Sequence, residues 1–267
     1  MSAAKTVVIT GSTRGVGRGL AESFLKLGCN VVVSGRNQAA VDQAVSELGA
    51  VGSCTGLACD ITKAADIQAL WNTATGSYKT VDVWINNAGI SIPRQAIQDS
   101  QLADLEAIVA TNLLGVLLAN KVVIAEMAKQ GSGQVWNMEG FGSNGAAQKG
   151  MAAYGATKRA VNYLNKALRK DVAGTGVQIC TLSPGIVVTD LLIGDYELGT
   201  EEWQKSKKIF NILGDKVDTV CPWLAQKVLA SNKDGAKVEW LTTGKAFGRF
   251  MTAGFKKRDL FADIPNA

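Results

Sequence analysis

Short apolar runs alternate along the chain with segments in which apolar residues recur every three or four positions. The first run, 6–10, is almost entirely β-branched, which is typical of a strand buried on both faces of a parallel sheet. Similar runs predict further strands at 30–34, 81–85, 134–138, 177–182 and 237–241, and 57–59 is expected to end the third strand. The periodic segments between them predict helices whose apolar faces carry Leu20, Phe24, Leu25, Leu27, Val41, Val45, Leu48, Ile67, Leu70, Trp71, Leu113, Val116, Leu117 and Val123.

Strand and helix alternate without an evident linker, charge block or repeat, so residues 1–267 are expected to form one domain. The alternation predicts an α/β fold with a doubly wound, mostly parallel sheet of seven strands and right-handed crossovers. Ligands in such sheets bind at the carboxyl ends of the strands. The polar motifs described below all fall at these ends, which makes that edge the expected site.

Composition narrows the function classes. The net charge of +5 suits an anionic cofactor as well as nucleic acid, but no recognition motif accompanies the basic residues, so no nucleic-acid partner is expected. There is no histidine, and the five cysteines contain no C-x-x-C pair, so reduced thiols and no metal site are expected. No signal peptide precedes the first strand, and no apolar run approaches the roughly 20 residues that span a bilayer. These features predict a cytoplasmic protein without a membrane span.

Tyr154 and Lys158 are four residues apart, so both side chains are expected on one face of a helix. A lysine close to a phenol favours the phenolate and is expected to lower the pKa of Tyr154. Such a pair suits the proton transfer that accompanies hydride transfer to a carbonyl. Most Tyr-x-x-x-Lys pairs are solvated helix faces, so this pair gains weight only from its neighbours in the sequence.

A glycine-rich segment, 10–17, joins the first strand to the first helix. Glycines allow a close backbone approach to a diphosphate, whose charge is stabilised by the N–H groups at a helix N-terminus. An ordinary glycine-rich turn is the alternative, but the position at the first strand–helix junction favours a dinucleotide site.

These two motifs, with Asn86-Asn87-Ala88-Gly89 and Pro184-Gly185, closely resemble the pattern of the short-chain dehydrogenase/reductase family from Lys5 to Thr189. The resemblance implies a Rossmann domain that binds a nicotinamide cofactor. It implies that Tyr154 is the acid/base, that Lys158 binds the nicotinamide ribose, and that Asn112 anchors a proton-relay water. The implied cofactor contacts are Gly11, Ser12, Thr13, Arg14, Gly15, Val16, Gly17, Asp60, Ile61, Asn87, Ala88, Gly89, Tyr154, Lys158, Pro184, Gly185, Ile186 and Thr189.

Simpler roles stay open for some of these residues. Asn86 and Asn87 could serve only as turn formers. Asp60 could cap the helix that follows it. Asn112 could face solvent.

The choice of cofactor follows from the end of the second strand. NAD enzymes usually place a carboxylate there, whereas this chain reads Val33-Ser34-Gly35-Arg36-Asn37. Arg14 in the glycine loop and Arg36 could bind a 2′-phosphate through bidentate hydrogen bonds. NADP(H) is therefore the expected cofactor, and a solvated Arg36 is the alternative.

One position departs from the family pattern. A serine usually follows the fifth strand, but aligning Asn137 with the asparagine that ends this strand puts Gly140 in its place. Ser143 could take over the missing hydrogen bond, or it could be a turn residue. Glu139 would oppose a developing alkoxide but could stabilise an iminium, which leaves imine reduction as an alternative activity.

Residues 137–145, 153–159 and 184–192 also resemble the chlorophyll(ide) b reductase branch of the family, which uses NADPH to reduce a formyl group. From the family resemblance, 190–212 is expected to be a substrate lid, and 237–267 the last strand and a tail. The lid's apolar residues suit a bulky substrate. The tail interleaves aromatic and basic residues and is expected to cover the pocket or a subunit interface, with a membrane-surface helix as the alternative.

The leading hypothesis is an NADPH-dependent reductase of an aldehyde or ketone on a bulky apolar compound, active as a homodimer or homotetramer formed through the helices around Leu113 and Val161. Besides imine reduction, the alternative is a catalytically weak NADP(H)-binding sensor or scaffold protein.

Overall fold

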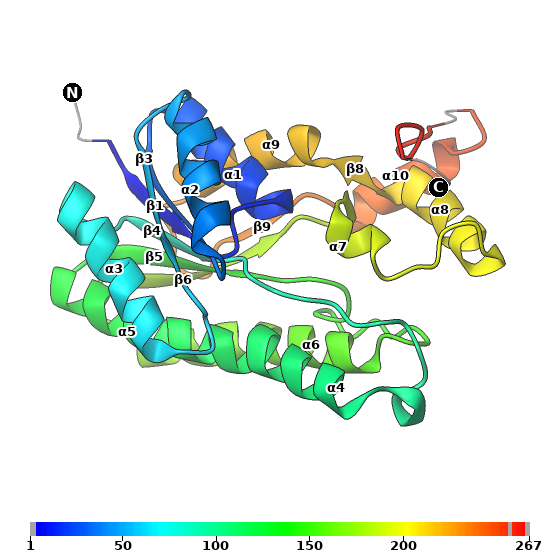
Figure 1. The fold of residues 1–267 in the computed structure, drawn as a ribbon, viewed down its shortest axis with the longest axis horizontal. Helices are drawn as coiled ribbons and strands as arrows, with labels where there is room; N and C mark the ends of the chain where they lie inside the picture. Colours follow the sequence, from blue (N-terminus) through cyan, green and yellow to red (C-terminus); the bar gives the residue numbers. More distant parts are fainter. Residues whose placement is uncertain (1–3, 256–257, 265–267) are drawn as a thin grey trace.

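The computed structural model describes residues 4–255 and 258–264, so Lys256 and Lys257 of the tail lie outside the described residues. A seven-stranded sheet forms the centre of the molecule, in the order β3-β2-β1-β4-β5-β6-β9 (Figure 1). Its strands are β1 (Thr6–Ile9), β2 (Asn30–Gly35), β3 (Cys54–Ala58), β4 (Val83–Asn86), β5 (Gly133–Met138), β6 (Val177–Ser183) and β9 (Lys237–Glu239).

The predicted fold is confirmed, and every strand pairing described in this sheet is parallel. In the centre, Val8 of β1 lies between Val32 of β2 and Trp84 of β4. The strand order reverses between β1 and β4, and this point is where a doubly wound sheet leaves a crevice at its carboxyl edge.

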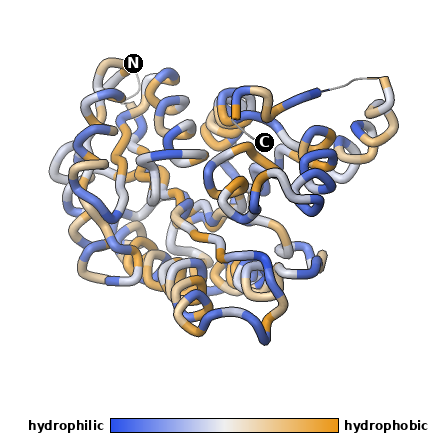
Figure 2. The backbone as a smooth tube through the Cα atoms, turned by 45° about the vertical axis from the view of Figure 1, so that its right-hand side comes forward, coloured by the Kyte–Doolittle hydropathy of each residue, from blue (hydrophilic) through white to orange (hydrophobic). Residues whose placement is uncertain are grey.

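Helices cover both faces of the sheet (Figure 1). The strands are largely apolar segments between helices of mixed hydropathy (Figure 2). One face packs against α1 (Gly15–Lys26), α2 (Gln38–Gly49) and α9 (Val217–Ala230), and the other against α3 (Ala64–Tyr78), α5 (Gly115–Gln130) and α6 (Ala152–Asp171).

The helix before β5 is longer than its neighbours, because α4 (Leu102–Val109) continues through a π-helical turn (Ala110–Leu114) into α5. By length and composition this helix, Leu102–Gln130, could cross a membrane, although core helices of soluble folds pass the same test. Here its inner side packs against the sheet through Ala119, Val123 and Met127.

A chain of hydrogen-bonded amides runs through the core beside the site. Asn137 of β5 accepts from Asn86 of β4 at 2.7 Å and donates to Asn165 of α6 at 2.7 Å. The chain is completed by hydrogen bonds that involve Trp84, Asn120 and Thr181. Because each of these buried polar groups has a partner, the strand ends are held in one arrangement.

A smaller unit extends from the carboxyl edge and contains α7 (Asp190–Ile193), α8 (Glu201–Leu213) and α10 (Thr243–Thr252), with a two-stranded sheet of β7 (Val187–Val188) and β8 (Asp215–Lys216) (Figure 1). Trp203, Phe210 and Phe261 form its apolar core. The lid aromatics Trp203 and Phe210 therefore pack against each other and the tail. The α10 helix contacts α8 and exposes Phe247 and Met251.

Buried Asp215 of β8 fastens the tail to this unit. It accepts hydrogen bonds from Trp240 at 2.6 Å and Arg258 at 2.6 Å, and it pairs with Arg249 at 2.8 Å. Hydrogen bonds to a charged group are stronger than neutral ones, so this cluster fixes where the tail crosses the lid.

Candidate functional site

The glycine loop lies between β1 and α1, as predicted, and its glycines are required by close packing. Gly11 and Gly15 have φ values of 62° and 58°, which L-residues with side chains rarely adopt. A Cβ on Gly11 would lie 2.8 Å from the Cα of Ala88, and one on Gly17 would collide with the backbone of Gly11 and the side chain of Asn87. The glycine loop and the turn after β4 are thus pressed together, which leaves the N-terminus of α1 open toward the carboxyl edge.

Ser12 supports this loop from inside. Its hydroxyl donates to Ile9 O at 2.7 Å and accepts from Ser34 N–H at 2.9 Å, while its own N–H donates to Ser34 O. The polar groups of Ser12 therefore join the ends of β1 and β2, and its contact with the cofactor stays a prediction. Thr13 packs its side chain against Gly35.

Two arginines lie beside the crevice, one at the glycine loop and one after β2. Arg14 is the N-cap residue of α1 and lies 3.8 Å from Asp190 across the crevice, with both side chains exposed. Arg36 is exposed and lies close enough to Asp60 to help lower the pKa of that carboxyl, although hydrogen bonding from Thr62 lowers it more. Asp60 accepts from both the N–H and the hydroxyl of Thr62, so it forms a turn and does not cap α3.

Ile61 is buried and packs against Gly115 in the core. Thr189, on the far side of the crevice, lies opposite the glycine loop: a Cβ on Gly15 would lie 3.6 Å from its methyl group. Pro184, Gly185 and Ile186 form the turn between β6 and β7 behind it. Thr189 thus borders the crevice opposite the glycine loop, whereas Ile61 lies in the core.

The turn after β4 is pinned by side chains. Asn87 donates to the carbonyl oxygens of Thr10 and Gly11, both at 2.9 Å, and Thr10 Oγ1 accepts from the N–H groups of Asn87 and Ala88. Asn112 is buried in the π-helical turn, where its amide both accepts from and donates to the backbone of Ile90 at 2.8 Å. Asn112 therefore does not face solvent, and its side chain ties the loop between β4 and α4 (87–101, the 90s loop) to the helix; its role in anchoring a relay water stays a prediction.

Tyr154 and Lys158 lie on one face of α6, as their spacing predicted. Lys158 Nζ donates to Met138 O at the end of β5, at 3.2 Å, and lies 5.7 Å from the centroid of the Tyr154 ring. Burial lowers the pKa of Lys158 to about 8, while the carboxylate of Glu139 opposes that fall.

The expectation that Lys158 lowers the pKa of Tyr154 is wrong for this structure. Burial raises the pKa of Tyr154 to about 12, Asp195 adds to the rise, and Arg94 opposes it. The reason is geometric: the ammonium group is directed at a strand carbonyl. Tyr154 is consequently a protonated donor across the neutral range.

Gly140 occupies the position expected from the alignment, beside Tyr154. A Cβ on Gly140 would lie 2.6 Å from the Tyr154 hydroxyl and 3.3 Å from the Cε of Lys158. Any side chain at this position would therefore displace Tyr154.

Ser143 does not replace the missing serine. Its buried hydroxyl accepts from Gly140 N–H at 3.1 Å and donates to Lys158 O at 3.2 Å. The predicted catalytic role of Ser143 is therefore corrected to a structural one, because these bonds close the loop onto α6.

Glu139 is also engaged elsewhere. It accepts from Asn162 at 2.6 Å, and its other oxygen lies 3.7 Å from Lys237 Nζ. With both carboxylate oxygens turned to α6 and β9, Glu139 offers no support for an iminium.

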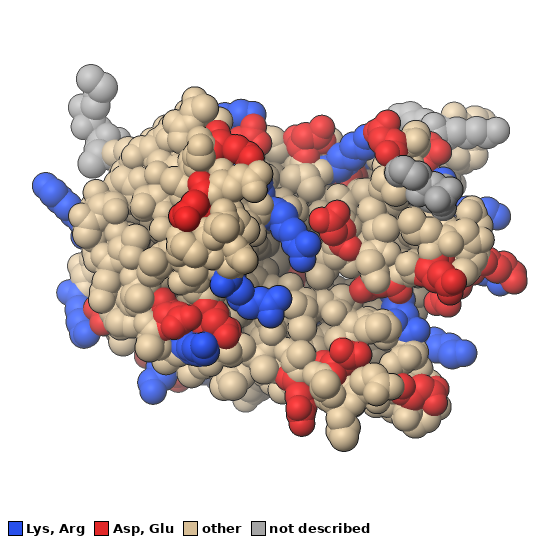
Figure 3. All heavy atoms as spheres, viewed as in Figure 1, with Lys and Arg blue, Asp and Glu red and all other residues tan. Residues whose placement is uncertain are grey.

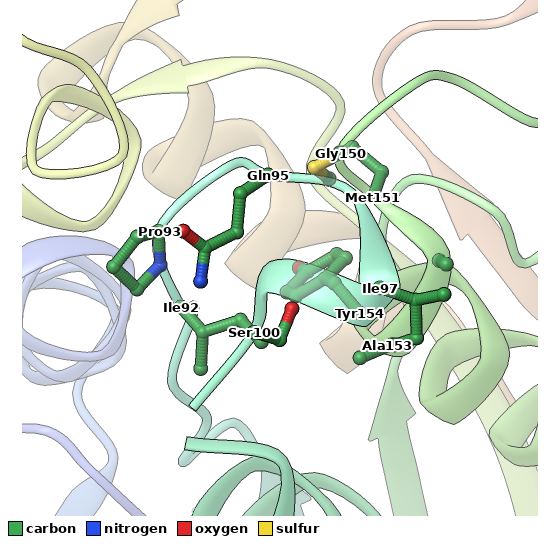
Figure 4. A pocket seen from close by; sticks show the side chains of 10 residues that line it. Ile92, Pro93, Gln95, Ile97, Ser100, Gly150, Met151, Ala153 and Tyr154 are labelled. Carbon is green, nitrogen blue, oxygen red and sulfur yellow. The ribbon is translucent and has the colours of Figure 1, made fainter. Parts of the chain in front are cut away.

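The loop between β4 and α4 carries groups that the sequence did not single out. A cavity of about 10 Å³ separates this loop from the start of α6, and Tyr154 lines it together with Ile92, Pro93 and Gln95 (Figure 4). Between Pro93 and Gln95, Arg94 lies 3.8 Å from Asp195 of the lid, and both side chains are about nine-tenths buried. Basic side chains also gather beside a hollow on the face shown in Figure 3, with acidic groups on its lid side.

Known proteins are similar to this chain in sequence and in fold. A family model described as "short chain dehydrogenase" matches residues 5–197. The chlorophyll(ide) b reductase NOL of Oryza sativa subsp. japonica is 34% identical over 92% of this chain and 74% of its own length. The probable chlorophyll(ide) b reductase NYC1 of Arabidopsis thaliana is 31% identical over 97% of this chain, which spans about half of that protein, 55%.

Among solved structures, a 3-ketoacyl-(acyl-carrier-protein) reductase from Brucella melitensis, complexed with NADH, superposes with a TM-score of 0.77 at 26% identity. The match covers 90% of this chain and 97% of that one. With the family pattern placed residue by residue around one crevice, the chain belongs to the short-chain dehydrogenase family of oxidoreductases.

Proposed function

We propose that the protein is an NADPH-dependent reductase of an aldehyde or ketone on a bulky apolar compound. The observation that carries the proposal is the pair Tyr154 and Lys158, placed side by side at the carboxyl edge beside a position that has no side chain, Gly140. The relatives named as chlorophyll(ide) b reductases support carbonyl reduction, and a formyl group on a large flat ring system is the substrate class that their names suggest.

The residues present fit a dinucleotide. The glycine loop permits close approach at the N-terminus of α1, where N–H groups and the helix dipole favour a diphosphate. Arg14 and Arg36 would hold the 2′-phosphate, and Thr189 and Ile186 would border the nicotinamide end. The bound cofactor would supply hydride to the carbonyl carbon.

Tyr154 would donate its phenolic proton to the carbonyl oxygen, since its raised pKa keeps it protonated until an alkoxide develops. Lys158 would hold the nicotinamide ribose of the cofactor beside Tyr154, as the family resemblance implies. The π-helical turn at Asn112 lies in the wall of the site, where it would anchor a relay water.

The first test is a panel of apolar aldehydes, ketones and imines with NADPH, followed by loss of absorbance of the reduced nicotinamide. We expect turnover with at least one aldehyde or ketone and none with imines. Tight NADPH binding without turnover of any carbonyl would contradict the proposal.

Tight NADPH binding without turnover would favour the alternative that the protein is a sensor or scaffold that only binds the cofactor. The absence of a hydroxyl donor at Gly140 and the structural engagement of Ser143 support this alternative, because losing one oxyanion donor typically lowers a rate by about 10²–10³.

Cofactor choice gives a separate prediction. Replacing Arg36 with Gln is expected to raise the Kd for NADPH about 10–100-fold, the value of a charge-assisted phosphate contact, and to change the Kd for NADH less than about threefold. Titration of intrinsic fluorescence would measure both constants. Lys129→Gln, which alters an exposed cation at the other end of the sheet, is the control. Equal losses for both cofactors would remove Arg36 from the phosphate site.

A homo-oligomer is proposed from the outer surface of α5 and α6. A groove of about 390 Å³ lies there, lined by Leu117, Ile124, Leu164 and Leu168. Replacing half-exposed Leu117 with Glu is expected to convert a dimer or tetramer to smaller species in light scattering. Leu27→Glu, at an equally exposed leucine after α1, should leave the mass unchanged. An unchanged mass for Leu117→Glu would place the interface elsewhere.

A cytoplasmic location is proposed from the thiols. The five cysteines are free, and burial raises the pKa of Cys59, Cys180 and Cys221 to about 12, which keeps them unreactive. Detection of the protein in fractionated cells would test the location.

A further inference from the structure

Arg94 is a buried cation whose hydrogen-bonding capacity is largely unused. Its side chain is 9% exposed, and its Nε is buried without a hydrogen-bond partner among the described residues. The nearest carboxylate oxygen, on Asp195, is 3.8 Å from that Nε, which is too far for a hydrogen bond. A desolvated guanidinium left this way is costly, and a better-placed anion would stabilise it.

Neighbouring groups pack against Arg94 but leave its Nε without a hydrogen-bond acceptor in the part of the chain that the structure describes. Its guanidinium carbon lies 4.5 Å from the centroid of the Tyr196 ring, so one face is stacked. A Cβ on Gly150 would lie 3.1–3.2 Å from Arg94's backbone carbon and Cβ, so the segment before α6 packs closely on it. Stacking leaves the in-plane N–H donors available, and these match a carboxylate in bidentate geometry.

Asp195 has its own partner. Ser91 donates to the same Oδ2 at 2.9 Å, so the lid carboxylate is tied to the 90s loop by a hydroxyl and only loosely by the cation. Asp195 belongs to the turn between α7 and α8, whereas Arg94 and Ser91 belong to the loop that Asn112 pins to the helix wall. Asp195 and the stacked Tyr196 both belong to the lid, so movement of the lid would free Arg94 and Ser91 from both of these contacts.

This position is next to the proposed reaction centre. Arg94 stands in the loop that, with Tyr154, lines the cavity of Figure 4. Both Arg94 and Asp195 also act on the pKa of Tyr154, Asp195 raising it and Arg94 lowering it, as expected of charges close to its hydroxyl.

We propose that Arg94, assisted by Ser91, binds a carboxylate of the substrate, and that Asp195 takes the place of that carboxylate when the lid is closed on the empty crevice. The substrate class is thus a carbonyl compound with a carboxylate within a ring's width of the reacting group. This inference rests on the proposed carbonyl reduction.

The test uses the full chain, NADPH and two matched probes, 4-formylbenzoate and its methyl ester. For the unaltered protein we expect a KM at least about tenfold lower for the acid. Arg94→Gln should raise the KM for the acid about 10–100-fold, with the ester changing less than about threefold. Asp195→Asn, which removes the competing carboxylate, should not raise the KM for the acid.

A lid latch predicts a different pattern. If Arg94 and Asp195 only fasten the lid, both variants would weaken acid and ester alike, and this result would overturn the proposal, as would equal KM values for acid and ester in the unaltered protein. Thermal melting and the Kd for NADPH should be the same in both variants, which separates a local effect from misfolding.

Binding of benzoate and benzamide, measured by calorimetry with NADPH present, gives a readout that does not need turnover. Benzoate binding that is lost in Arg94→Gln supports the carboxylate site even if neither probe is reduced, in which case the proposed reaction alone fails. Benzoate binding that persists in Arg94→Gln overturns the site even if both probes are reduced.

Discussion

Replacing Tyr154 with Phe is expected to lower NADPH-dependent carbonyl reduction about 10³-fold or more, while the Kd for NADPH stays within about threefold. The substitution removes only the hydroxyl oxygen of Tyr154, which lies beside Gly140. It keeps the aromatic ring that packs against the 90s loop. Stopped-flow measurement of nicotinamide oxidation, with fluorescence titration of the cofactor, would give both numbers.

The matched control for this change is Tyr163→Phe, because Tyr163 lies on the same helix and is 73% exposed. It should leave rate and affinity unchanged. If Tyr154→Phe kept its rate, the proton would come from another group and the proposed chemistry would be abandoned. If the unaltered protein had no rate to lose, the binding-protein alternative would stand.

Replacing Lys158 with Met is expected to reduce activity and increase stability at the same time. Turnover should fall about 10²-fold or more, since no ammonium group would then hold the ribose of the cofactor beside Tyr154. The free energy of unfolding at pH 7 should rise by roughly 2 kcal/mol: removing a buried ammonium whose pKa is about 8 gains about 3 kcal/mol, and the lost bond to Met138 O costs about 1 kcal/mol.

The pH dependence of this effect has a definite sign. The folded pKa of Lys158 lies below its ordinary value of 10.5, so at pH 7 the amine is charged in both states and the penalty of burial is fully present. As the pH rises from about 8 to about 10.5, the folded protein loses the proton first, and the stability of the unaltered protein increases relative to Lys158→Met. Its reduction rate should fall over the same rise, as the cation is lost.

Urea unfolding at pH 7 and pH 10, with Lys166→Met as control, would check the stability difference. Lys166 is exposed on the same helix, so its replacement should change stability little at either pH. A Lys158→Met protein that is less stable than the unaltered one at pH 7 would show that the Met138 bond outweighs the buried charge.

The elements of the fold could be read from the sequence because buried parallel strands and amphipathic helices have distinct periods. All seven strands of the main sheet lie where the apolar runs predict them, and only their ends differ by a few residues. The pair β7–β8 was not foreseen, because strands of two residues give no periodic signal. The lid's attachment through Asp215, Arg249 and Arg258 joins residues far apart in the chain, and spacing does not encode such contacts.

At the site, sequence spacing predicted which residues meet but not how their polar atoms are used. The glycine loop, Tyr154 and Lys158 lie around one crevice as expected, and Gly140 fills the serine position. The side chains of Ser12, Ser143 and Asn112 can hydrogen-bond either to a ligand or to the backbone. In the structure each of them bonds to the backbone. Arg94 was missed because its significance depends on burial beside a lid residue about a hundred positions later, Asp195.

The side-chain amides that link β4, β5 and α6 neither gain nor lose a proton in the pH range in which carboxyl groups, thiols and lysines ionise. The hydrogen bonds around Tyr154 therefore do not depend on pH in this range, although the charge of Lys158 beside it does. At high pH the protein should consequently lose activity before it unfolds. This inactivation should reverse when the protein is returned to neutral buffer.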